Sequence, residues 1–377
     1  MEVLQTVFEA LVVIFIVATM FGVGLTTTFS GLGNVFKNTW FILGALVASL
    51  LAIPLLGWGI AELFNLPTAS YIALVLLAAS AGGPFSVALN KNQKGDVVSG
   101  AAMMVLLALI GSVATPLIAD WLFGLSDTVS GAVGSINVGE LVRTIVILQV
   151  IPLFLGMSMS SWTPGTASTW NPPVGRVASV SFVAVMAGML LGGFRDVIAL
   201  FGTRTLIAAA VAGLLFFAAG WLLSPGPERL RSTGGFVGGV RNVAPVLVIA
   251  LGAFADVDGL VPAIITILLV TLILNLFLAS YLGNRHAQDP EDLTIVEGIG
   301  PEIETVLYDA GITTLYELGT TSSGDIEIIL TESDLALNLA RPATWPRQAS
   351  LAAMGEDNQL ARLQEELIGG VEPDKRS

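Results

Sequence analysis

Nine long apolar stretches follow one another through the first 287 residues of this chain, and they restrict its fold more than any other feature. A stretch of roughly 20 apolar residues is long enough to cross a lipid bilayer, where backbone groups find no water to bond. Because a helix satisfies those groups within one segment, the pattern predicts an all-α polytopic membrane protein with about nine transmembrane helices. The stretches lie at residues 5–26, 38–61, 68–90, 97–123, 140–160, 177–194, 204–223, 232–253 and 258–282.

The composition agrees with a membrane protein and removes the residues that most enzymes use. Hydrophobic residues make up 54% of the 377-residue chain and charged residues only 12%, which is too apolar for a soluble domain. There is no cysteine and a single histidine, His286, so disulfides, thiolate metal sites and most nucleophilic or acid–base schemes are excluded. We therefore predict no enzyme activity, no catalytic residue, no metal site and no cofactor.

The charge is unevenly distributed and marks a domain boundary. Residues 288–377 contain 18 acidic and 5 basic side chains, which accounts for the whole net charge of −13. The preceding residues are neutral overall, because their acidic and basic side chains balance. This break predicts a transmembrane domain at 1–287 and a small soluble acidic domain at 288–377.

The basic residues predict the orientation of the chain in the membrane, since cytoplasmic loops are enriched in lysine and arginine. If the N-terminus is outside, three basic residues fall in outer segments, namely Arg143, Arg195 and Arg204. Seven fall in cytoplasmic segments: Lys37, Lys91, Lys94, Arg176, Arg229, Arg231 and Arg285. The acidic domain is then cytoplasmic. The first stretch has no basic residue before it, so we expect a retained helix rather than a signal peptide.

Two of the apolar stretches are interrupted by helix-breaking residues. Ala81-Gly82-Gly83-Pro84-Phe85-Ser86 breaks the third, and the segment from Gly234 to Pro245 breaks the eighth. The two are five stretches apart, so they enter the membrane from opposite sides. Paired interruptions of this kind are typical of inverted repeats in transporters and lie near the binding site. The nine stretches divide into four and five, with the first repeat lacking its opening helix.

Short motifs in this order resemble the bile acid:sodium symporter superfamily. They are Phe21-Gly22-Val23-Gly24-Leu25-Thr26, Ala81-Gly82-Gly83, Lys94-Gly95-Asp96 and Gly239-Val240-Arg241-Asn242. The resemblance covers about residues 1–285. It implies a panel domain and a core domain, with two broken crossover helices that meet near the membrane midplane. In that family the crossing point binds sodium and faces an organic substrate, commonly an anion.

The chain departs from the family at the positions whose side chains bind sodium there. The matching positions here are Val87, Gly100, Met104 and Val237. Ser86 and Asn242 are retained, while Arg241 stands where the family has glutamine. Because a hard cation requires several oxygen ligands, these differences argue against sodium coupling of the family type.

Arg241 is the sharpest signal in the sequence, because a charge deep in a bilayer normally faces a cavity or a partner. Its guanidinium could replace sodium as a tethered cation for the carbonyl ends of the broken helices. It could also present its fork of donors to an anionic substrate. Two further interpretations stay open: a side chain that reaches the cytoplasmic interface, and a pair with a buried carboxylate such as Glu9.

The other candidate residues surround the two interruptions. Glycines such as Gly83 and Gly239 either let the backbones cross or let helices pack closely. Gln149, three residues before Pro152, either lines a cavity or satisfies a kinked backbone. The complete set of predicted substrate- or ion-binding residues is Arg241, Asn242, Ser86, Gly83, Pro84, Gly239 and Gln149.

The acidic domain resembles a helix-hairpin-helix module of the kind attached to varied bacterial proteins. The segment from Leu293 to Pro301 contains the Gly-Ile-Gly turn, Pro301 suits the first turn of a helix, and Gly311 suits its C-terminal cap. We expect further helices near 325–339, 344–354 and 357–368. Glutamates surround the turn, and phosphate binding needs basic residues, so nucleic acid is an unlikely partner. A protein-interaction module or a passive folded tail remains.

Together these features predict a secondary transporter or facilitator of small organic, anionic solutes that works by alternating access. The expected partners are the solute, membrane lipid and a cytoplasmic protein that binds residues 288–377. The expected location is a bacterial inner membrane. The alternative is a solute sensor, receptor or scaffold that keeps a transporter fold and signals through the cytoplasmic domain.

Overall fold

A computed structural model describes residues 2–35, 38–126, 137–200, 203–286, 290–333, 341–354, 356–367 and 370–371. The chain divides into two compact units. The first contains residues 1–95 and 99–280, and the second contains residues 281–377 with the short segment 96–98. Among the described residues the regular elements are all helices, which confirms the predicted all-α class.

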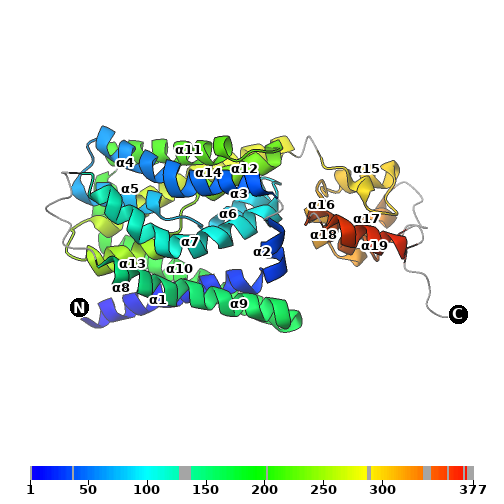
Figure 1. Ribbon diagram of the computed structural model, residues 1–377, viewed down its shortest axis with the longest axis horizontal. Coiled ribbons are helices and arrows are strands. Elements are labelled where there is room, and N and C mark those ends of the chain that lie inside the picture. The colour runs from blue at the N-terminus through cyan, green and yellow to red at the C-terminus, as the bar shows by residue number, and fades with distance from the viewer. Residues whose placement is uncertain are drawn as a thin grey trace. The chain divides into compact units, whose positions relative to one another are not determined.

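Helices lie at all nine predicted apolar stretches (Figure 1). Within the described residues, six helical stretches are long and apolar enough to cross a membrane. The helices of this part of the chain are α1 (Glu2–Leu25), α2 (Phe29–Val35), α3 (Thr39–Val47), η1 (Ala48–Ala52), α4 (Ile53–Leu63), α5 (Thr68–Ala79), α6 (Phe85–Asn92), α7 (Val97–Phe123), α8 (Val138–Ile145), η2 (Val146–Val150), α9 (Ile151–Trp162), α10 (Pro164–Leu200), α11 (Arg204–Leu223), α12 (Glu228–Gly239), α13 (Val243–Ala253) and α14 (Leu260–His286).

These helices pack in two groups. In one, α1 lies against both α9 and α10. In the other, α4 packs on α5 and α11, and α11 packs on α12. The second group contains the largest apolar core, in which α5 is buried on all sides around Tyr71 and Leu74. A helix that is apolar all round is stable only when it is surrounded in this way.

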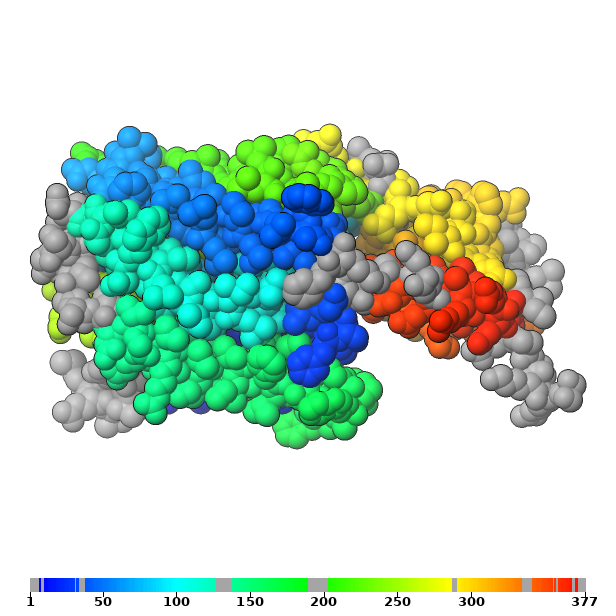
Figure 2. All heavy atoms as spheres, in the orientation of Figure 1, coloured from blue at the N-terminus to red at the C-terminus, as the bar shows by residue number. Residues whose placement is uncertain are grey.

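The outward-facing side chains of the first unit are apolar, as a bilayer requires. Figure 2 views this unit from a face to which α4, α7 and α9 contribute. Leu55 of α4, Leu117 of α7 and Leu155 of α9 are all exposed. In a soluble protein so much exposed apolar surface would drive aggregation, whereas in lipid it costs nothing.

Both interrupted stretches are broken helices, and their breaks touch. The first break separates α5 from α6, and Gly82 adopts a positive φ of 78° within it. The second separates α12 from α13. The Asn242 amide donates to Ser80 O at 3.4 Å, and the Ser80 hydroxyl donates to Asn242 O. A Cβ on Gly83 would lie 2.7 Å from Arg241 O, so only glycine permits this approach.

The second break is shorter than the sequence predicts. The glycines from Gly234 to Gly239 lie inside α12, and only residues 240–242 leave the helix. Added Cβ atoms there would meet neighbouring helices, for example the Phe217 ring 2.6 Å from Gly235. Close helix packing therefore explains these glycines, because their missing side chains let α11 approach α12.

Two of the long helical stretches contain a π-helical turn, and in both a proline follows the turn. In η1 the Ile53 amide donates to Ala48 O, and the next residue, Pro54, has no amide to give to Ser49 O. In η2 the Ile151 amide donates to Val146 O, and Pro152 follows. Each turn therefore leaves one backbone carbonyl without a helical donor.

The second unit is a small bundle of short helices with its own core. Its elements are η3 (Leu293–Ile295), α15 (Pro301–Asp309), α16 (Leu315–Thr320), α17 (Ser323–Glu332), α18 (Trp345–Ala353) and α19 (Asp357–Glu365). Trp345, Leu307 and Ile326 are fully buried at its centre. Pro301 begins α15, and Gly311 takes a φ of 87° after its end. The predicted helix at 325–339 begins earlier, at Ser323, and residues 334–340 lie outside the described part; α16 was not predicted.

Candidate functional site

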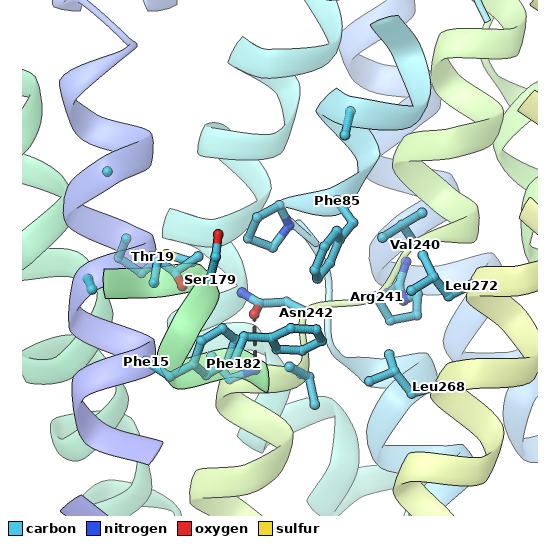
Figure 3. A pocket seen from close by; sticks show the side chains of 18 of the residues that line it. Phe15, Thr19, Phe85, Ser179, Phe182, Val240, Arg241, Asn242, Leu268 and Leu272 are labelled. Atoms are coloured by element: carbon cyan, nitrogen blue, oxygen red, sulfur yellow. Dashed lines mark hydrogen bonds between the residues drawn. The ribbon is translucent and has the colours of Figure 1, made fainter. Parts of the chain in front are cut away.

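A cavity of about 360 Å³ lies between the two packing groups of the first unit. One wall comes from α1 and α10, and the opposite wall comes from both helix breaks together with α14. Figure 3 shows the second break entering this space, with Asn242 between the side chains of α1, α10 and α6. The cavity is therefore bounded by elements that are far apart in the sequence and belong to different packing groups.

The cavity walls are mainly apolar and include three aromatic rings. Phe182 of α10 packs against Phe15 of α1 and Phe85 of α6, with ring centroids 5.3 and 5.2 Å apart. These rings connect the two packing groups across the cavity. Thr19, Ser179 and Asn242 contribute polar groups. A pocket with an apolar wall and few polar groups suits a small organic molecule whose orientation those groups select.

Arg241 and Asn242 are adjacent but extend to opposite sides of the second break (Figure 3). The backbone is extended at Val240 and at Asn242, and consecutive side chains of an extended chain point in opposite directions. Both residues line the cavity, and the guanidinium of Arg241 extends away from it into the packed helices behind the break. This separation assigns the two polar residues to different surroundings.

The guanidinium of Arg241 is buried, with 4% of the residue exposed, and donates only to backbone carbonyls. Its bonds are Nε to Leu77 O at 3.2 Å, Nη1 to Gly238 O at 3.0 Å, Nη2 to Ser49 O at 3.2 Å and Nη2 to Ala78 O at 2.8 Å. The side chain of Glu9, the carboxylate considered from sequence, lies outside the described residues. Four of the five N–H groups are thus engaged with backbone, which leaves little for a substrate.

Each of these carbonyls is available because of local helix geometry. Ala78 lies in the last turn of α5 and Gly238 in the last turn of α12, where carbonyls lack helical donors. Leu77 lies in the same turn of α5, and its carbonyl also accepts from the Ser80 amide at 3.2 Å. Ser49 lies in η1, where Pro54 has no amide to offer. The C-terminal ends of α5 and α12, which are partially negative, and the unpaired carbonyl of Ser49 therefore all bond to the guanidinium of Arg241.

Asn242 has a defined amide orientation, and it determines that of Gln149. Asn242 Oδ1 accepts from the Ala244 amide at 3.1 Å and caps α13, so its Nδ2 donates to Gln149 Oε1 at 3.1 Å. Gln149 is 1% exposed, and its Nε2 finds no partner among the described residues. The cavity-lining Thr19 Oγ1 also has none there. Gln149 itself is not among the residues that line the cavity, and its Nε2, which has no partner among the described residues, is a donor and not an acceptor.

The other predicted positions divide between the cavity and the core. Pro84 and Gly239 line the cavity. Ser86 is buried and donates to Gly83 O at 2.7 Å, which makes it a support for the first break. Gly83 contacts the backbone of Arg241 and serves the approach of the two breaks.

The positions that match sodium ligands in the family pack as ordinary core. Met104 lies in an apolar cluster with Met20 and Leu153, and Val87 packs against it. Val237 lies in another apolar cluster, beside Phe41. These three side chains offer no oxygen to a cation.

Sequence reasoning missed the aromatic and hydroxyl lining contributed by α1 and α10. Phe15, Phe182, Thr19 and Ser179 line the cavity, yet each looks ordinary within an apolar stretch. The only signal was a small or polar residue at helical spacing on α10: Asn171, Gly175 and Ser179 recur every fourth residue.

The fold and the cavity define a polytopic membrane protein with a solute-sized cavity against two broken helices. Comparison with known proteins then gives the family. A family model described as "Sodium Bile acid symporter family" matches residues 13–201, half of the chain. This chain belongs to the sodium bile acid symporter family, which confirms the resemblance drawn from its motifs.

Individual relatives are distant. The chain is 20% identical over 200 residues to the "Uncharacterized sodium-dependent transporter YocS" of Bacillus subtilis, covering 52% of this chain and 59% of that protein. It is 23% identical over 270 residues to the "Probable sodium/metabolite cotransporter BASS3, chloroplastic" of Arabidopsis thaliana, covering 70% and 61%. The match to the "Uncharacterized protein YbaS" of Bacillus subtilis is 24% over 278 residues, covering 72% and 87%. The chain thus spans less than two thirds of the first two relatives.

Proposed function

We propose that this protein carries a small organic solute across a membrane by alternating access. The observation that carries the proposal is the cavity, whose walls come from α1 and α10 on one side and from the two helix breaks and α14 on the other. Movement of α1, α9 and α10 against the remaining helices would expose the cavity to one side at a time. The printed names of two relatives, a sodium-dependent transporter and a sodium/metabolite cotransporter, agree with this function.

The solute that fits best has an apolar body and an anionic or otherwise hydrogen-bond-accepting group. The three phenylalanine rings favour an apolar body. The N-terminus of α13 begins at Val243 on the cavity wall, and positive helix ends favour negative charge. The volume of about 360 Å³ limits the solute to a small molecule.

A cavity-filling substitution tests this function. Purified protein is screened by thermal shift against small carboxylates, and uptake of the stabilising ones is then measured in proteoliposomes. Ser179→Trp places an indole in the cavity and should reduce uptake at least tenfold. Val180→Trp is the matched control, because Val180 is 69% exposed on the same helix and does not line the cavity. Equal uptake by both variants and the unsubstituted protein would exclude the cavity as the transport site.

A solute sensor or scaffold is the second candidate, because residues 281–377 form a compact unit with a core of its own. Such a protein would bind solute without carrying it, and would pass the signal to a cytoplasmic protein bound by the acidic unit. Thermal stabilisation by a solute, combined with uptake no greater than in protein-free liposomes, would favour it over transport. The charge of this unit argues against nucleic acid as its partner.

We further propose an outer N-terminus and a cytoplasmic acidic unit in a bacterial inner membrane. The support is the excess of basic residues in the segments assigned to the cytoplasm. The chain contains no cysteine, so single cysteines can be introduced for labelling with a membrane-impermeant thiol reagent. Glu302→Cys should be protected in intact cells and labelled after lysis; labelling in intact cells would reverse the orientation.

A further inference from the structure

The groups that surround Arg241 are those of a cation-binding site, and they differ from the surroundings of an arginine that binds a substrate. Four carbonyl oxygens converge on the guanidinium from η1, from the end of α5 and from the end of α12. We call these oxygens, from Ser49, Leu77, Ala78 and Gly238, the carbonyl ring. Backbone carbonyls and helix C-terminal ends are the groups that bind Na⁺ and K⁺ in transporters and channels.

Three of the four oxygens, those of Ser49, Ala78 and Gly238, have no other donor among the described residues, whereas Leu77 O also accepts from the Ser80 amide at 3.2 Å. The Ser80 amide turns back to Leu76 O and Leu77 O, and the Asn242 amide crosses to Ser80 O, so the Ala78 and Gly238 carbonyls receive no helical hydrogen bond. Pro54 removes the donor for Ser49 O. A buried acceptor without a donor is strongly unfavourable, so the two breaks can meet here only if a donor group or a cation lies between them.

We propose that the carbonyl ring is a monovalent-cation site which the protein's own Arg241 permanently occupies, and that shortening this side chain opens the site to a free cation. Arginine remains protonated in proteins, so the charge is constant and cannot leave on either side of the membrane. The second part of the inference, which rests on the proposed transport function, is that solute flux does not require a sodium gradient.

The first experiment uses the full chain in detergent and does not depend on transport. Arg241→Ala is compared with the unsubstituted protein by thermal unfolding in choline chloride, NaCl, KCl and guanidinium chloride, each at a few tens of millimolar. We expect Arg241→Ala to unfold at a lower temperature in choline chloride. Na⁺, K⁺ or guanidinium should then raise its Tm saturably by several degrees, because binding to the folded state shifts unfolding. The unsubstituted protein should respond equally to all four salts.

A matched control distinguishes the effect of emptying the carbonyl ring from the general effect of removing an arginine. Arg231→Ala removes an arginine from α12 that stacks on Trp221, with its Cζ 3.7 Å from the ring centroid, and touches none of the four carbonyls. It should show no difference between choline and the other cations. A cation response equal to that of Arg241→Ala would overturn the proposal, as would an Arg241→Ala variant that no cation stabilises.

A second variant keeps the proposal open to test if Arg241→Ala does not fold. Arg241→Lys retains a cation with three donors instead of five, so it should fold, unfold below the unsubstituted protein, and show no preference for Na⁺ over choline. Stabilisation of Arg241→Lys by Na⁺ would contradict an occupied site.

The second experiment measures uptake of an identified solute into proteoliposomes with inward NaCl or choline chloride gradients. We expect rates within twofold of each other for the unsubstituted protein. Strict sodium dependence would overturn the uncoupled mechanism while leaving the transport function intact. If no uptake is seen but cations still stabilise Arg241→Ala, the proposed transport function would be excluded and the proposed cation site would stand.

Discussion

The helix breaks and the acidic unit satisfy orphaned backbone groups with opposite charges. At the breaks, the cation of Arg241 donates to three carbonyls at the ends of helices and to one in the π-helical turn η1. In the acidic unit, carboxylates accept from amides: Glu304 from Leu293 at 2.7 Å and Glu317 from Thr313 at 2.8 Å. The excess negative charge of this unit therefore has a structural use, independent of any partner.

The two regions differ in what can bond to the backbone groups once the charged side chain is removed. Water can reach the partly buried amides of the acidic unit, because Glu304 and Glu317 are only half-buried. At the breaks the surroundings are buried helix and apolar side chain. The same type of bond should therefore stabilise the breaks far more than the acidic unit, since unpaired groups cost most where water is excluded.

The largest effect is expected from Arg241→Ala. Three buried acceptors lose their donor, while Leu77 O keeps the Ser80 amide. At about 1–3 kcal/mol for each of the three groups, with partial relaxation, we expect a loss of roughly 3–5 kcal/mol in the free energy of unfolding. Denaturant unfolding in detergent measures it. Arg231→Ala should cost about 1 kcal/mol, mainly from the stacking on Trp221. Similar losses in the two variants would remove the contrast between a ring of carbonyls and a surface arginine.

Gly83→Ala should have the next largest effect. A Cβ at this position would lie 2.7 Å from Arg241 O and 2.8 Å from Val240 O, and neither backbone atom can move without separating the breaks. We expect a loss of about 1–3 kcal/mol, by overpacking, measured by the same unfolding experiment. Gly59→Ala is the matched control, because no atom lies within 4 Å of its added Cβ. It should be neutral or stabilise α4 by up to about 1 kcal/mol.

In the acidic unit, Glu304→Ala should cost less than either change at the breaks. It removes the acceptor for the Leu293 amide and for the Tyr308 hydroxyl, which we expect to cost about 1–2 kcal/mol. Hydrogen exchange of the full chain measures this locally, with faster exchange at Leu293. Glu302→Ala, two residues away and exposed, should leave that exchange unchanged. A cost above that of Arg241→Ala would reverse the comparison.

The smallest expected effect is an acid-dependent loosening at Asp292. Its carboxylate accepts from the Thr294 hydroxyl and from the Thr294 amide at 2.9 Å, and these bonds lower the pKa of Asp292. A lowered pKa in the folded state gives stability that is present above the unfolded value, near 3.9, and is lost as the pH falls through the folded value. Exchange at Thr294, corrected for intrinsic rates, should therefore increase only below about pH 4. Asp292→Asn should abolish this dependence.

The position of each broken helix was predictable, but the extent of the second break was not. Glycine and proline within apolar stretches marked both segments, and Gly82 does adopt a positive φ. The glycines from Gly234 to Gly239 carry the same local signal, yet they remain helical because α11 packs against them. Sequence alone does not distinguish a glycine that bends the chain from one that admits a neighbour.

The candidate site likewise divides into features that could be predicted from the sequence and features that depended on the tertiary structure. Arg241 and Asn242 were identifiable because polar residues are costly in a bilayer. Their separate surroundings depended on the extended backbone between α12 and α13. The carbonyls of Ser49 and Ala78 could not be recognised beforehand, because every residue has a carbonyl and only the fold decides which ones lack a helical donor.

The amino-acid sequence by itself determined the class of protein, the order of the apolar helices, the family and the boundary in charge. These follow from local physics, since a lipid solvent enforces helices and short motifs record ancestry. Only the tertiary structure decided what Arg241 binds, which glycines serve packing, and how α1 and α10 complete the cavity. Those features depend on contacts between residues that lie up to 192 positions apart, as between Ser49 and Arg241, and no local pattern specifies which distant backbone atoms will meet.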